Sequence, residues 1–143
     1  MATQATAARI AAIPVQEAMH AGVFACDRDA QLVDVAAVMA REHVHCVVVE
    51  SGSGEDGPLW GVVSDLDLVA ASTVRDLADQ HAGGSAASPL VMVSPDESLE
   101  RAAQLMTEHG TAHLVVVDRT TLRPVGVLST LDIARFLSKE AER

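Results

Sequence analysis

An internal repeat runs through most of this 143-residue chain. A shift of 67 residues aligns VFACDRDAQLVDVAAVM, which begins at residue 23, with LVMVSPDESLERAAQLM, which begins at residue 90. A shift of 65 residues aligns GVVSDLDL with GVLSTLDI, and the change of two residues falls in the loop SGSGEDGP, where a difference in length is expected. Repeated segments in the same order predict two similar structural units.

The ends of the two copies are less clearly marked. VQEAM at residues 15–19 resembles VRDLA at residues 74–78 with a shift of only 59, which predicts extra residues in the second copy, in HAGGSAAS. On this alignment we expect a flexible N-terminal segment over 1–13, a first repeat over 14–72 and a second repeat over 73–143. A unit of roughly 60 residues buries little apolar surface alone, so the two are expected to pack against each other with pseudo-twofold symmetry.

Each copy is predicted to contain a helix, a short strand, a second helix, a strand, a turn, a strand and a final helix. Ser94-Pro95-Asp96-Glu97 has the composition of a helix start, with a capping serine and proline at the first helical position. Apolar residues follow at helical spacing until Gly110, which is placed to end the helix. The first copy has the same spacing, with Asp27 or Asp29 as its expected cap.

The strands are predicted from continuous β-branched runs. CVVVE and HLVVVD are typical of strands covered on both faces, and LWGVV and PVGVL follow them after polar turns. Each copy should therefore form a small sheet packed with helices, which gives an α/β fold.

Composition excludes several classes of function. The formal net charge is -10, from 20 acidic residues against 10 Lys and Arg, which disfavours nucleic acid as a partner. No apolar run reaches the roughly 18 residues of a membrane span, and the N-terminus has no signal-peptide pattern, so we expect a soluble cytoplasmic protein without a membrane partner. Cys26 and Cys46 are expected to be small buried thiols.

GVVSDLD and GVLSTLD allow two interpretations. Ser64 and Asp67, like Ser129 and Asp132, have the spacing of a capping box, in which serine and acid close the first turn of a helix. The same strand-to-helix corner also offers backbone donors, a hydroxyl and a carboxylate that can hold the sugar and phosphates of a nucleotide. The two roles are compatible.

The doubled pattern, with Gly-h-h-Ser-x-x-Asp (h apolar) closing each copy, resembles the cystathionine-β-synthase-type (CBS) domain and in particular a tandem pair of such domains, the Bateman module. The resemblance covers about residues 14 to 138. It implies a module that binds adenine nucleotides or related adenosyl compounds in the clefts between paired domains and acts as an energy or metabolite sensor.

The resemblance also implies roles for individual residues. Asp67 and Asp132 would accept hydrogen bonds from the ribose hydroxyls, with Ser64 and Ser129 beside the ribose and phosphates. A family position near the phosphates, often basic, corresponds to His45 after Val44 in the first copy and to Ala112 after Thr111 in the second. The adenine would be lined by the apolar strand that begins each repeat, including Ala25 and Met92.

We therefore predict a regulatory module, without catalytic residues, that binds an adenosine-containing ligand and signals to a partner through a conformational change. AMP is most favoured, followed by ADP, ATP and S-adenosylmethionine. Few basic residues lie near the motifs, which disfavours tight binding of a triphosphate. No further cofactor is required on this prediction, and the helices DLDLVAAS and TLDIARFL are candidate faces for a homodimer.

The alternatives are a ligand-free dimeric interaction scaffold and, less favoured, a metal-responsive regulator that uses His43 and His45. Two histidines on alternate strand positions supply too few ligands for a typical zinc site, so no metal site is predicted.

Overall fold

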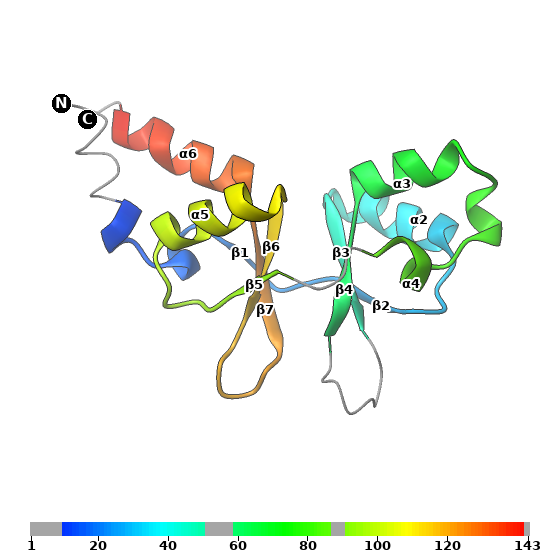
Figure 1. The fold of residues 1–143 in the computed structure, drawn as a ribbon, viewed down its shortest axis with the longest axis horizontal. Helices are drawn as coiled ribbons and strands as arrows, with labels where there is room; N and C mark the ends of the chain where they lie inside the picture. Colours follow the sequence, from blue (N-terminus) through cyan, green and yellow to red (C-terminus); the bar gives the residue numbers. More distant parts are fainter. Residues whose placement is uncertain (1–9, 51–58, 87–90, 142–143) are drawn as a thin grey trace. The chain divides into compact units, whose positions relative to one another are not determined.

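The computed structural model describes residues 10–50, 59–86 and 91–141. The chain divides into two compact units, unit 1 (Met1–Gly22 with Val91–Arg143) and unit 2 (Val23–Leu90). Each unit is a small sheet with helices against one face (Figure 1). The mixed α/β architecture of the prediction is confirmed.

Unit 2 contains a three-stranded sheet in the order β2-β3-β4. Strand β2 pairs in parallel with β3, and β3 pairs antiparallel with β4. The elements follow the chain as β2 (Ala25–Asp27), α2 (Leu32–Glu42), β3 (Cys46–Glu50), β4 (Leu59–Ser64), α3 (Asp65–Ser72), η2 (Leu77–Asp79) and α4 (Ala82–Ser85).

Unit 1 contains a four-stranded sheet in the order β1-β7-β6-β5. Its outer strand β1 comes from the N-terminal part of the chain and pairs antiparallel with β7. The elements are η1 (Val15–Glu17), β1 (His20–Ala21), β5 (Met92–Val93), α5 (Leu99–His109), β6 (His113–Val117), β7 (Pro124–Ser129) and α6 (Thr130–Ala141).

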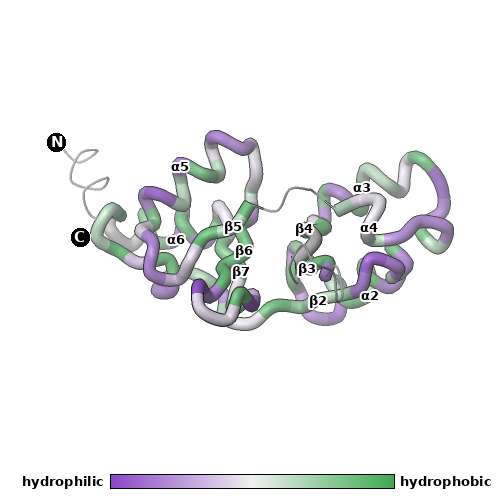
Figure 2. The backbone as a smooth tube through the Cα atoms, turned by 60° about the horizontal axis from the view of Figure 1, so that its bottom comes forward, coloured by the Kyte–Doolittle hydropathy of each residue, from purple (hydrophilic) through white to green (hydrophobic). Residues whose placement is uncertain are grey.

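Each unit has its own apolar core between sheet and helices. Helix α5 alternates hydrophilic and hydrophobic residues along its length (Figure 2), as an amphipathic helix over a sheet does. The buried cluster of unit 2 consists of Leu32, Val35, Met39, Val47, Val49, Val63, Leu68, Ala71 and Ala82. That of unit 1 consists of Val15, Val93, Leu99, Ala102, Met106, Leu114, Val116, Leu128 and Ile133. The predicted helical spacing and buried strands are therefore correct.

Two predicted helix starts are wrong. Helix α5 begins at Leu99 and not after Ser94, because the Ser98 hydroxyl caps it by accepting a hydrogen bond from the Arg101 N–H at 3.1 Å. In the first copy, α2 begins after Gln31, which makes no side-chain cap, so neither aspartate caps it. The predicted end of α5 is correct, since Gly110 has the left-handed conformation with φ 59°.

The start of each copy packs with the other copy. Val15 belongs to the core of unit 1, whereas Ala82 belongs to the core of unit 2. Their backbones make equivalent hydrogen bonds, because the Val15 N–H donates to the Glu97 carbonyl at 2.7 Å and the Ala82 N–H donates to the Ala30 carbonyl at 2.8 Å.

These contacts correct the alignment at residues 15–19. Val15 and Ala82 differ by 67 residues, as do Glu97 and Ala30, so the shift of 67 continues upstream and the pairing of VQEAM with VRDLA at 59 is wrong. The segment AGGS, which the sequence suggested was extra, forms α4 in the position that η1 occupies in unit 1. The predicted repeats, 14–72 and 73–143, stay predictions, and the compact units have other bounds.

Candidate functional site

In unit 2 the motif GVVSDLD forms the corner between β4 and α3. The Ser64 N–H donates to Asp67 Oδ2 at 2.8 Å, and the Asp67 N–H donates to Ser64 Oγ at 3.2 Å, which completes the predicted capping box. Within the described part of the chain, Asp67 Oδ1 has no hydrogen-bond partner. One oxygen of this half-buried carboxylate therefore remains available to a ligand.

In unit 1 the motif GVLSTLD forms the same corner between β7 and α6. The Ser129 N–H donates to Asp132 Oδ2 at 2.9 Å, and the Asp132 N–H donates to Ser129 Oγ at 3.1 Å. Here Asp132 Oδ1 also lies 2.8 Å from Nε2 of His20, and the Asp132 side chain is only 4% exposed. No local motif links His20 to Asp132, so this contact could not be predicted from the sequence.

The predicted phosphate-side positions lie beside these corners. The His45 carbonyl accepts a hydrogen bond from the Asp65 N–H at 2.9 Å, and the Ala112 carbonyl accepts one from the Thr130 N–H at 2.9 Å. The preceding residues, Val44 and Thr111, each donate a backbone hydrogen bond to the end of the helix before them. The structure therefore brings His45 and Ala112 next to the residue that follows the serine of their own unit, whereas Val44 and Thr111 contact the end of the preceding helix.

The predicted adenine strands lie on the same sheets. Ala25 pairs with Val48, which pairs with Val62, two residues before Ser64. Because paired residues and alternate residues share a face, these side chains lie on the face opposite to Val47, Val49 and Val63, which pack in the core. Strand spacing and rise put the backbones of Ala25 and Ser64 roughly 12 Å apart.

Unit 1 repeats this arrangement and extends it. Met92, Val115, Val127 and His20 form one row across β5, β6, β7 and β1. Met92 is 49% exposed, so it can contribute apolar contact to a ligand on this face. The row ends in His20, the partner of Asp132.

The charges around the two corners differ. In unit 2, His45 Nδ1 lies 2.9 Å from Asp65 Oδ2, so the histidine faces a carboxylate. Asp65 and Asp67 occupy the first turn of α3, where acids are stabilised by the helix dipole. In unit 1, threonine and alanine stand at the positions of Asp65 and His45, so the corner carries fewer charges.

Neither cysteine has the environment of a reactive thiol. Burial, with a smaller contribution from Asp65, raises the pKa of the Cys46 thiol to about 11. Burial also raises the pKa of Cys26, and both thiols are free. Because the thiolate is the nucleophile and the metal ligand, these residues are structural.

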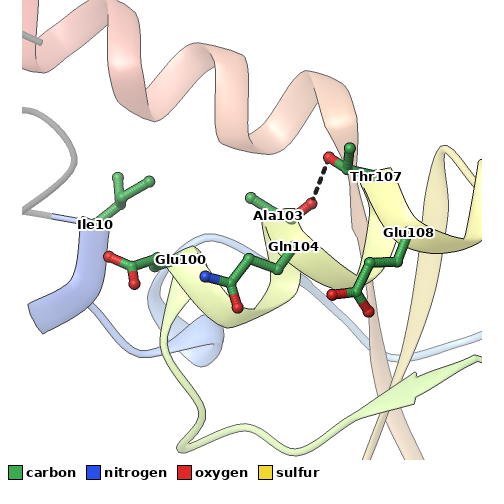
Figure 3. Close-up of a pocket in the computed structure, with 6 residues that line it drawn as sticks. All are labelled: Ile10, Glu100, Ala103, Gln104, Thr107 and Glu108. Atoms are coloured by element: carbon green, nitrogen blue, oxygen red, sulfur yellow. Dashed lines mark hydrogen bonds between the residues drawn. The ribbon is translucent and has the colours of Figure 1, made fainter.

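A surface hollow of about 380 Å³ lies elsewhere in unit 1, on α5 (Figure 3). It contains none of the predicted site residues and is lined by Ile10, Glu100, Ala103, Gln104, Thr107 and Glu108. Among the described residues, no group of three or more His, Cys, Asp or Glu side chains could hold a metal ion. No helix in the described ranges is long and apolar enough to cross a membrane.

Comparison with known proteins identifies the family. The model of the CBS domain matches the chain twice, over residues 15–79 and 84–139. The chain therefore belongs to the CBS domain family, as the two matching corners and the duplicated α/β fold indicated, and it carries the domain in tandem.

Several known proteins are similar to most of this chain. The CBS domain-containing protein YhcV of Bacillus subtilis is 29% identical over 121 residues, which are 84% of this chain and 82% of YhcV. The CBS domain protein PAE2072 from Pyrobaculum aerophilum, solved in complex with AMP, is 27% identical with a TM-score of 0.76, over 92% of this chain and all of that one. Hypoxic Response Protein I, solved with two coordinated zinc ions, is 25% identical with a TM-score of 0.69, over 86% of this chain and 98% of that one.

Proposed function

We propose that this protein is a regulatory ligand-sensing module that binds an adenosine-containing ligand and signals its occupancy to a protein partner. The observation that carries the proposal is the corner at Ser64 and Asp67, where a capped helix start leaves one carboxylate oxygen without a partner in the described chain. A carboxylate oxygen can accept hydrogen bonds from adjacent hydroxyls, which favours a sugar diol. The similarity to a CBS protein that was solved with AMP supports the adenosyl class.

The ligand would extend along the sheet face between Asp67 and Ala25. The backbones of Ser64 and Ala25 lie roughly 12 Å apart, and the ribose would bind at the corner and the base against the first strand. The start of α3 and His45 would lie at the phosphate. In unit 1, Ser129, Thr111, Ala112 and Met92 occupy the corresponding positions.

Among adenosyl ligands, the charge distribution favours AMP. Asp65 lies against His45, and the chain carries a net charge of -10, so each added phosphate meets more repulsion. We accordingly rank ADP and ATP below AMP. S-adenosylmethionine carries no phosphate, and we rank it below AMP because the similar CBS protein PAE2072 was solved with AMP. Such a module would sense the energy state of the cell.

Signalling requires that the ligand bind one arrangement of the protein better than another. We propose that the output involves a homodimer formed through α3 and α6, because large apolar side chains are exposed on both helices. These are Leu66 (73% exposed), Val69 (62%) and Leu131 (51%). A ligand that favours one packing of these helices would change the surface offered to the partner protein.

Thermal unfolding of ligand-stripped protein with AMP, ADP, ATP, S-adenosylmethionine, NAD and zinc tests the proposal. A ligand at about 100 times its dissociation constant adds roughly 2.7 kcal/mol of stability, which raises the midpoint by about 5 to 10 °C in a domain of this size. We expect the shift with AMP, and we expect Asp67→Ala to reduce it.

Asp79→Ala is the matched control, since Asp79 is an exposed acid of unit 2 in η2 and outside the corner. If none of the adenosyl ligands raises the unfolding midpoint, the proposal is contradicted and a ligand-free interaction scaffold is favoured. A shift with zinc alone would favour a metal-responsive regulator.

A further inference from the structure

His20 holds the carboxylate that the second adenosyl site would need. Its Nε2 lies 2.8 Å from Asp132 Oδ1, and its own side chain is 69% exposed whereas that of Asp132 is 4% exposed. The imidazole therefore lies between solvent and the carboxylate. A ligand hydroxyl that approaches this corner meets His20 before it meets Asp132.

Both oxygens of Asp132 already have partners. Oδ2 accepts from the Ser129 N–H at 2.9 Å, and Oδ1 is paired with His20. A carboxylate with 4% exposure has little surface left for a third contact. A sugar diol can reach it only if the imidazole leaves.

The backbone of His20 is held in the sheet, whereas its side chain is exposed and contacts Asp132 only through Nε2. His20 pairs with Val127 in the sheet, and a Cβ on Gly126 would lie 2.5 Å from the His20 carbonyl oxygen and 2.8 Å from Met19 Sδ. Glycine at position 126 thus permits β1 to lie close to β7. Rotation of the exposed imidazole is the movement that would release Asp132 without displacing β1.

Among its described residues, unit 2 has no equivalent contact. Asp67 makes the same capping box, but its Oδ1 has no hydrogen-bond partner among the described residues. The shift of 67 that relates the starts of the two copies pairs His20 with residue 87, which lies outside the described residues and is alanine. An alanine side chain cannot donate a hydrogen bond to a carboxylate.

From these contacts we infer that His20 is a specificity-determining residue that occupies the ribose acceptor of the Asp132 site and makes the two sites unequal. This inference rests on the proposed function. The Asp67 site binds an adenosyl ligand directly, whereas the Asp132 site binds only when the ligand displaces His20. The His20–Asp132 pair is partly exposed, so removal of the imidazole should raise the affinity of the Asp132 site for the ligand roughly tenfold.

Calorimetric titration of the full chain with AMP tests the inference. The titration compares Asp67→Ala, which removes the Asp67 site, with a double variant that carries Asp67→Ala and His20→Ala. We expect the double variant to bind AMP about tenfold more tightly than Asp67→Ala alone. His20→Gln in the same background, which keeps a donor at this position, should give a smaller increase. His109→Ala, at the end of α5, is the control and should give none.

The outcomes separate the two claims. If wild-type protein and all variants fail to bind AMP, the proposed function is wrong and this inference falls with it. If wild-type protein binds AMP but His20→Ala leaves affinity at the Asp132 site unchanged, only the inference is overturned. Weaker binding in the double variant would also overturn it, because His20 would then be a ligand contact. Asp67→Asn replaces Asp67→Ala should that variant not fold, because its amide oxygen can still accept from the Ser64 N–H while its amide nitrogen cannot accept from a ribose hydroxyl.

Discussion

His43 and Gly110 occupy matching positions at the ends of α2 and α5, and both have the left-handed backbone conformation, with φ 55° and 59°. Glycine adopts this conformation freely, whereas a residue with a side chain pays roughly 1 kcal/mol. The shared cap explains why both helices stop at the same point of the repeat. Nothing in the described structure explains the choice of histidine at position 43.

Cys46 makes stability depend on pH in the alkaline range. Burial raises the pKa of its thiol from 9.0 to about 11 in the folded protein, so the folded state keeps a proton that the unfolded state loses. Its contribution to stability is complete below pH 9 and is lost as the pH rises through 11. Denaturant unfolding at several pH values should show a loss of about 2 to 3 kcal/mol over this range.

Cys46→Ala should remove most of this loss. A residual dependence should remain from Cys26, whose pKa burial also raises. If the variant and the wild-type protein lose the same free energy of unfolding between pH 9 and 11, Cys46 is not the group responsible.

At the scale of the elements, the Ser-x-x-Asp motif determines where helices α3 and α6 begin. Ser64 with Asp67, and Ser129 with Asp132, satisfy the free N–H groups at the starts of α3 and α6. The capping box depends only on residues three apart. This is why the corner could be predicted from the sequence.

The exposed apolar residues of α3 carry the prediction of a dimer. Leu66 and Val69 lie three residues apart on the helix and are 73% and 62% exposed, so they form a neighbouring pair on its surface. Light scattering at micromolar concentration should give the mass of a dimer, and Leu66→Lys with Val69→Lys should give a monomer. The control Val74→Lys, at a 76% exposed residue after α3, should leave the dimer intact. A monomeric wild-type protein would contradict the prediction.

At the scale of the whole molecule, the start of each repeat packs in a core formed mainly by the other repeat. Residues far apart in the sequence therefore share one core. Val15 is fully buried in the core of unit 1 with Leu99 and Leu128. Val15→Ala should therefore cost about 2 kcal/mol, and amide hydrogen exchange should increase more in β6 than in β3.

Val35→Ala is the matched change, since Val35 is 2% exposed and belongs to the core of unit 2. It should have the reverse effect and accelerate exchange chiefly in β3. If Val15→Ala instead accelerated exchange mainly in β3, the N-terminal segment would pack with its own repeat.

The sequence by itself determined the duplication, the amphipathic helices, the buried strands and the two capped corners, because each depends on residues within a few positions of one another. The tertiary structure alone decided where the short segments pack. Strands β1 and β5 have two residues each, too few for a pattern, and the start of each repeat is placed by the core that it fills. The contact between His20 and Asp132 likewise joins residues 112 positions apart, and only the pairing of β1 with β7 brings them together.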